Sequence, residues 1–117
     1  MISINKVTLI GNLGEDPVLG QAANGSYCTV SLATNESYKD KFDQWQTNTE
    51  WHKLKIWGKQ ADWFYEKFLK GDAVYIEGKI KYGSYAKADG AKVYTTDIDV
   101  KEFKKVLSES KQPDNPF

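Results

Sequence analysis

The sequence predicts an all-β fold with one helix: a five-stranded Greek-key barrel with the helix between the third and fourth strands. Apolar and polar residues alternate in three segments, 6–14, 51–57 and 73–82, which is typical of strands that bury one face, and 27–37 and 92–100 are expected to form two further strands. One segment between the third and fourth of these strands in chain order has a helical period instead. The length of 117 residues fits one domain with one core.

Each expected strand is a β-rich run that ends at turn-forming residues. The small-residue stretch 20–26 is expected to be turn and loop, and 83–91 a glycine-containing loop. The polar stretch 38–50 is expected to be a long, mobile hairpin tip. The expected strands are 6–14, 27–37, 51–57, 73–82 and 92–100.

The segment 59–70 is expected to form the helix, because its apolar residues recur on one helical face over three turns. Gly71 follows at the position typical of a helix C-terminus. The residues of the apolar face are Ala61, Phe64, Tyr65, Phe68 and Leu69.

Three strands, a helix and two further strands follow each other in the order of the OB-fold. We expect residues 1–105 to form this domain and residues 106–117 to form a short disordered tail. Because one fold hosts many functions, the function has to be argued from a site.

Alternation along 51–57 places two tryptophans and two lysines on one strand face, while His52 and the aliphatic residues face the core. Ammonium groups are costly to desolvate, so the first face is expected to be wet. Interleaved rings and cations suit single-stranded nucleic acid, because every base has a π-face and every nucleotide a charge. The alternative is that the tryptophans pack against a neighbouring subunit or loop. The face consists of Trp51, Lys53, Lys55 and Trp57.

The fourth expected strand and the hairpin tip repeat this pairing of rings with lysines. Tyr38 is followed by Lys39 and Lys41, and Tyr85 lies beyond the fourth strand. In that strand an apolar face is expected to hold Val74, Ile76, Ile80 and Tyr82. The opposite face is expected to hold Tyr75, Glu77, Lys79 and Lys81.

The basic residues number sixteen and all are lysine, against sixteen acidic residues. A net charge of zero counts mildly against nucleic-acid binding. Lysine, a mobile point charge, suits attraction to a phosphate backbone better than base reading. The candidate phosphate contacts are Lys6, Lys41, Lys53, Lys55, Lys59, Lys70, Lys79, Lys81 and Lys87.

Four segments resemble bacterial-type single-stranded DNA-binding proteins. They are NKVTLIGNLGEDP (5–17), TEWHKLKIWGK (49–59), KGDAVYIEGKI (70–80) and DGAKVYTTDIDV (89–100), and the similarity extends over residues 4–101. The resemblance implies sequence-independent binding and protection of single-stranded DNA in replication, recombination and repair. It also implies base stacking on Tyr38, Trp51, Trp57 and Tyr85.

The same resemblance implies a homotetramer, with a dimer as the alternative, built through the first strand, including Ile4, and through His52. The last four residues, Asp114, Asn115, Pro116 and Phe117, are similar to the family's Pro-Phe tip, which recruits replication and repair proteins. This tip has one aspartate rather than an acidic cluster, and the family's long linker is missing. Weaker or more selective partner binding is therefore expected, as in a phage-encoded or accessory member.

Enzymatic and metal-dependent functions are not favoured. Cys28 is expected to be a small buried side chain rather than a catalytic thiol. Asp97 and Asp99 share a strand face without a third clearly placed ligand, and a single histidine argues against a histidine-based zinc site. No cofactor and no membrane span are expected.

A lone cysteine and an N-terminus without a leader pattern predict a cytoplasmic protein. The resemblance adds the expectation that it is nucleoid-associated, or in the host cytoplasm if it is phage-encoded. Two other functions stay open. One is an RNA-binding OB module, and the other is a primosomal-type scaffold that uses the barrel mainly for protein contacts. The role of Trp63, which lies off the apolar face of the helix, is also left open.

Overall fold

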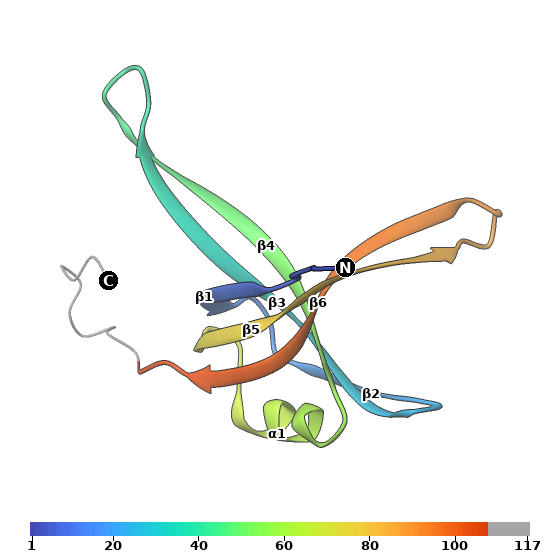
Figure 1. Cartoon of the computed structure of the whole chain (residues 1–117). Coiled ribbons are helices and arrows are strands. Elements are labelled where there is room, and N and C mark those ends of the chain that lie inside the picture. Colours follow the sequence, from blue (N-terminus) through green and yellow to red (C-terminus); the bar gives the residue numbers. More distant parts are fainter. Residues whose placement is uncertain (108–117) are drawn as a thin grey trace.

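The computed structural model describes residues 1–107 and contains six strands and one helix (Figure 1). The strands reach well beyond the centre of the molecule as two long hairpin arms, β3–β4 and β5–β6. In chain order the elements are β1 (Val7–Leu13), β2 (Val18–Ala22), β3 (Gly25–Lys39), β4 (Trp45–Trp57), α1 (Lys59–Lys67), β5 (Ala73–Ala86) and β6 (Lys92–Lys105).

The strands form one sheet in the order β1-β5-β6-β4-β3-β2, and β1 also pairs with β3. The extra pairing closes β1, β5, β6, β4 and β3 into a ring. Neighbouring strands are antiparallel except β4 and β6, which run parallel where Leu54 lies beside Ile98. The predicted class, all-β with one helix, is confirmed.

The prediction of five strands is wrong, because residues 18–22 form a sixth strand, β2, along the first part of β3. The helix therefore lies between the fourth and fifth strands in chain order, not the third and fourth. The stretch 20–26, expected to be a loop, contains the end of β2, a tight turn and the start of β3. Backbone hydrogen bonds hold this pairing, and they leave no periodic side-chain pattern in the sequence.

The arms are longer than predicted. Residues 38–50 were expected to be a mobile tip, but only 40–44 separate β3 from β4. Likewise β5 continues to Ala86. Strand β6 is also longer than predicted, but it extends at the end away from the arm, where Lys105 pairs with Val74. Ile80 and Tyr82, expected on an apolar face, are exposed because β5 has left the core by that point. Arms with water on both faces do not show the alternation by which a strand is recognised.

The helix is shorter than predicted. It ends at Lys67, and Phe68 already has an extended backbone. Tyr65 and Leu69 are exposed, contrary to the prediction. Gly71, with φ of 92°, lies in the turn before β5 and does not end the helix. Within residues 1–107, no helix is long and apolar enough to cross a bilayer.

The core lies inside the ring and under α1. Phe64 of α1 stacks on Phe68 with ring centroids 4.5 Å apart, and the ring of Phe103 meets Phe64 edge-on at 5.1 Å. Cys28 is completely buried, and burial raises the pKa of its thiol to about 11. A thiol that stays protonated at neutral pH fits a packing role. Other fully buried side chains are Leu32, Leu54, Ile56, Val74 and Ile76.

Candidate nucleic-acid interface

Strand β4 has the two faces that alternation predicts. Leu54 and Ile56 are buried and His52 is half-buried. On the other face Trp51 is 62% exposed and Trp57 is 36% exposed, although both are large apolar side chains. Water therefore reaches both rings, and their π-faces are accessible to a ligand.

Trp57 belongs to a compact cluster with Lys55 and with Tyr27 of β3. Tyr27 lies directly opposite Trp57 in the ladder, with ring centroids 5.5 Å apart. The Lys55 ammonium lies 4.7 Å from the Trp57 centroid and 4.8 Å from that of Tyr27. Attraction between the cation and the ring quadrupoles holds this ammonium beside two π-faces. Tyr27 was not among the predicted site residues, because only the β3–β4 register identifies it as a neighbour of Trp57.

Trp51 rests on Gly14, just beyond the end of β1. A Cβ atom at residue 14 would overlap the six-membered part of the indole ring. The Gly14 amide donates to the Ser31 carbonyl, which fixes this backbone against β3. Gly14 is therefore required for close approach, and the ring has a defined resting place on the surface.

Replacing Gly14 by alanine is expected to displace the Trp51 ring while leaving the fold intact. The added methyl group meets the far end of a side chain, which can move, rather than backbone. A smaller effect is expected than from removing the ring, because the indole stays available in a less ordered position. Intrinsic fluorescence and oligo-dT titration of the Gly14→Ala protein test this. An unchanged affinity would show that the resting place of Trp51 is unimportant for binding.

Two predicted ring positions border one hollow between β4 and the β5–β6 arm. This hollow has a volume of about 560 Å³, and Trp51 and Tyr85 are both at its edge. His52, Lys53 and the exposed Tyr94 line it as well. A flat ligand entering it would meet aromatic rings from two strands.

Trp57 and Lys55 border a second hollow of about 540 Å³. Lys81 and Lys101 reach it from β5 and β6, and Lys101 was not predicted. Asp97 and Asp99 also line it. In the β5–β6 ladder Lys81 lies opposite Asp97, and Lys79 lies opposite Asp99. The two carboxylates thus face lysines across the ladder. In the part of the chain described, no three metal-ligating side chains come together.

Replacing Asp97 by asparagine is expected to strengthen binding of a polyanion. Asp97 borders both the hollow of Trp57 and a neighbouring one that contains Lys53, so its charge opposes phosphate binding at the four lysines of these hollows. An affinity gain of several-fold is expected at low salt. The gain should shrink as salt is added, because salt screens the repulsion between Asp97 and phosphate over a Debye length of about 10 Å at 0.1 M. Titrations at two salt concentrations measure this. Equal affinities at low salt would contradict it.

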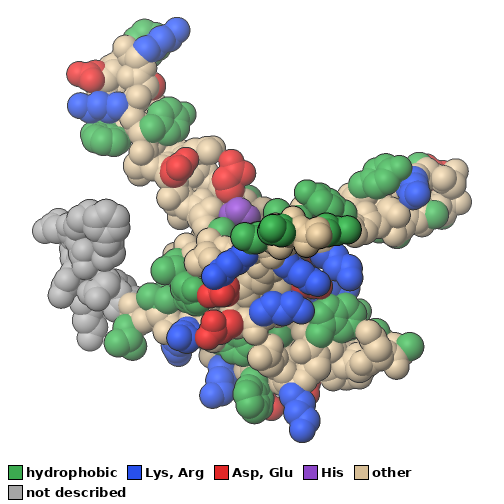
Figure 2. Space-filling view, in the orientation of Figure 1, with side chains coloured by type: hydrophobic (Ala, Val, Ile, Leu, Met, Phe, Trp, Pro, Cys, Tyr) green, Lys and Arg blue, Asp and Glu red, His purple; other side chains and the backbone are tan. Residues whose placement is uncertain are grey.

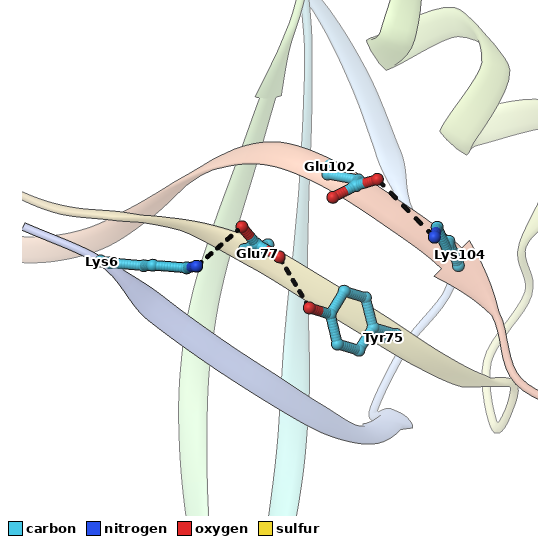
Figure 3. A network of polar contacts seen from close by, with 5 residues as sticks. All are labelled: Lys6, Tyr75, Glu77, Glu102 and Lys104. Carbon is cyan, nitrogen blue, oxygen red and sulfur yellow. Dashed lines mark hydrogen bonds and ion pairs between the residues drawn. The ribbon is translucent and has the colours of Figure 1, made fainter.

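The Lys6 ammonium is engaged by a carboxylate, as Figure 3 shows. It lies 3.3 Å from Glu77, which also accepts a 2.7 Å hydrogen bond from the Tyr75 hydroxyl. That hydrogen bond and the nearby Lys6 charge hold the pKa of the Glu77 carboxyl below its usual value. Any phosphate would have to compete with this carboxylate for Lys6.

The remaining predicted residues are spread over the molecule. Lys41 is in the β3–β4 turn, Lys87 in the β5–β6 turn, Lys59 at the start of α1, and Lys70 in the turn before β5. Tyr38 lies on the β3–β4 arm, on the face opposite to that of Trp51 and Trp57. Figure 2 shows lysine side chains gathered on the central body, below the point where the two arms diverge, and others toward the ends of the arms.

Of the residues predicted for oligomer contacts, His52 alternates with Trp51 along β4 but borders the same hollow as Trp51 and Tyr85. His52 shares a 2.9 Å hydrogen bond with the Thr34 hydroxyl, and Ile4, before β1, is exposed. Trp63 is exposed on α1. The predicted partner-binding tip, residues 114–117, lies outside the described residues.

A family model and two similar proteins that match this chain are all of single-strand binding proteins. The model of the "Single-strand binding protein family" matches residues 4–106. A single-stranded DNA-binding protein of Xylella fastidiosa is 44% identical over 96 residues, which is 81% of this chain and 58% of the relative. The corresponding protein of Xanthomonas campestris is 43% identical over 100 residues, 85% of this chain and 58% of the relative. The chain thus spans less than two thirds of the length of these relatives.

A solved structure described as a Plasmodium falciparum SSB complex with ssDNA superimposes with a TM-score of 0.81. It is 24% identical and covers 92% of this chain and 98% of its own. This likeness concerns the fold, and it supports the OB-fold predicted from the order of the elements.

Proposed function

The chain belongs to the single-strand binding protein family, and from this premise we propose that it binds single-stranded DNA without reading its sequence. One observation carries the proposal: Trp51 and Trp57 are exposed on the same face of β4, with Lys53 and Lys55 between them. Each ring borders a hollow large enough for a flat group.

In this mechanism the bases stack on the rings and the lysines neutralise phosphates. Stacking is tolerant of sequence because every base offers a π-face. The absence of arginine in the sequence supports this division of roles, since arginine makes the commonest specific base contact. Affinity should fall with salt at a logarithmic slope of about −0.7 per neutralised phosphate.

Tryptophan fluorescence tests the proposal directly, because three of the four tryptophans lie on β4. Oligo-dT is expected to quench the emission strongly, and duplex DNA of equal length only weakly. Oligo-U serves as a third ligand. Equal or tighter binding of RNA would favour an RNA-binding module, and equal quenching by the duplex would contradict base stacking.

We further propose that the protein is a non-enzymatic, cytoplasmic component of DNA replication, recombination and repair. Self-association through β1, through Ile4 before it and through His52 would let several domains share one DNA strand. Light scattering should give a tetramer mass, and a dimer with feeble oligo-dT affinity would favour a protein scaffold instead. The proposed role of Asp114–Phe117 in recruiting partners predicts that deletion of these residues leaves oligo-dT affinity unchanged.

A further inference from the structure

The β3–β4 arm keeps one register over its whole length. Every residue of β4 has a partner in β3, from Trp57 opposite Tyr27 to Trp45 opposite Lys39. No bulge interrupts this ladder, so the alternation of faces is never reset. The face that carries Trp51 near the core is therefore the same face that carries Trp45 at the end of the arm.

The two faces of this hairpin differ in charge and in ring content. Among the residues of β3 and β4, the face of Trp51 has no carboxylate, whereas Glu36 and Glu50 are on the other face, which has no lysine. Carboxylates of other segments approach the first face at three places: Glu15 at Ser31, Asp97 and Asp99 at the hollows of Lys53, Lys55 and Trp57, and Asp43 of the turn at Lys39. The rings and lysines of the first face are Tyr27, Lys39, Trp45, Trp51, Lys53, Lys55 and Trp57.

Trp45 at the outer end of this face resembles Trp57 in its setting. Its side chain is 70% exposed, and the Lys39 ammonium lies 5.6 Å from the ring centre. Lys39 also lies 3.7 Å from Asp43, but both side chains are exposed and such a pair is weak and screened by salt. Lys39 thus remains available to a phosphate.

The turn beyond Trp45 is held in one shape by Asp40. The Asp40 carboxylate accepts hydrogen bonds from the Phe42 amide at 2.8 Å and the Gln44 amide at 3.0 Å, and from the Gln46 side chain at 3.1 Å. These bonds tie both strands of the arm together next to Trp45. A ring in a pre-ordered position loses less entropy when a ligand stacks on it.

From these observations we infer that Trp45 and Lys39 form a third DNA-binding station, so that the strand lies along the whole of β4. Trp45, Trp51 and Trp57 are each six residues apart, which is about 20 Å in a strand. The track is then about 40 Å long. The sheet twist turns this face gradually, and an unpaired strand can follow the turn. The inference rests on the proposed function and extends its site outward.

Phe42 provides a matched control for Trp45. It is 72% exposed, and the Lys41 ammonium lies 5.4 Å from its ring centre. It lies in the turn rather than in the ladder, so it is outside the continuous face. A general attraction of DNA to aromatic rings at the arm end would involve both residues, whereas a track along β4 involves Trp45 alone.

The test compares Trp45→Ala, Trp45→Phe, Phe42→Ala and Trp51→Ala in the full chain. Each is titrated with a short oligo-dT of about 6 nucleotides, near the lower end of OB-fold site sizes, and a long one of about 30, well above them. Trp45→Ala is expected to bind the short oligonucleotide normally and the long one about fivefold more weakly, at the lower end of stacking effects. Trp45→Phe should retain most of the affinity, and Phe42→Ala all of it.

Normal binding of the long oligonucleotide by Trp45→Ala, beside weakened binding by Trp51→Ala, would overturn the third station and leave the proposed function standing. Equal losses in Trp45→Ala and Phe42→Ala would also overturn it. If Trp51→Ala also binds normally, it is the proposed function that fails. A changed mass of Trp45→Ala in light scattering would assign this ring to a subunit contact, contrary to the inference.

Discussion

Alanine in place of Trp51 or of Trp57 is expected to weaken oligo-dT binding by about 1–3 kcal/mol each, about 5- to 150-fold. Both rings are exposed and lie on the lysine-bearing face of β4, so their removal takes away stacking surface without opening the core. Trp57→Ala also removes one of the two rings that hold Lys55, and its salt dependence should change more than that of Trp51→Ala.

Fluorescence anisotropy of a labelled oligo-dT measures both variants, with thermal melting as the check on folding. Trp63→Ala is the matched control, since Trp63 is similarly exposed but lies on α1. The control should bind like the parent protein. Unchanged affinity in both β4 variants would mean that these rings pack against a neighbouring subunit or loop and do not contact DNA.

Phe64→Ala is expected to destabilise the fold by about 3–5 kcal/mol, a large part of the total stability of a small domain. Phe64 is completely buried and contacts the rings of Phe68 and Phe103, which connect α1 to the last strand. Removing it leaves a cavity under the helix that these neighbours can fill only in part.

Urea unfolding measures this loss, and the neighbouring Tyr65→Ala is the control. Tyr65 is exposed, so its substitution should change the stability by about 0.5 kcal/mol or less. Should Phe64→Ala not fold, Phe64→Leu still reports on the site through a smaller loss. Equal stabilities of the Phe64 and Tyr65 variants would contradict the central place of Phe64 in the core.

The sequence predicts those parts of the fold in which one face is buried. Leu54 and Ile56 alternate with lysines, and Ala61 and Phe64 share a helix face, so both patterns record contact with the core. The distal arms and β2 were missed because their pairing depends on backbone hydrogen bonds. Leu69 was wrongly placed on the core side because the periodicity of 59–70 continues past Lys67, where the backbone leaves the helix. Tyr65 lies within the helix but is exposed.

The candidate site was predictable along one strand and not across strands. Trp51 and Trp57 follow from alternation in β4, whereas Tyr38 and Tyr85 were indicated by the lysines near them in the sequence and by resemblance. Tyr27 and Lys101 become neighbours of Trp57 or its hollow through strand pairing, which the linear pattern does not contain. The pairing of Lys81 with Asp97 also depends on register, so the sequence did not predict that this carboxylate opposes phosphate binding at Lys81.

The burial of Cys28 has a practical consequence for following motion in this protein. Its thiol is buried and protonated at neutral pH, so maleimide dyes should not react with it. A cysteine introduced at Gln44 and another at Asp89, in the turns of the two arms, would then be the reactive pair. Energy transfer between dyes at these turns would report whether the arms draw together as a strand is captured.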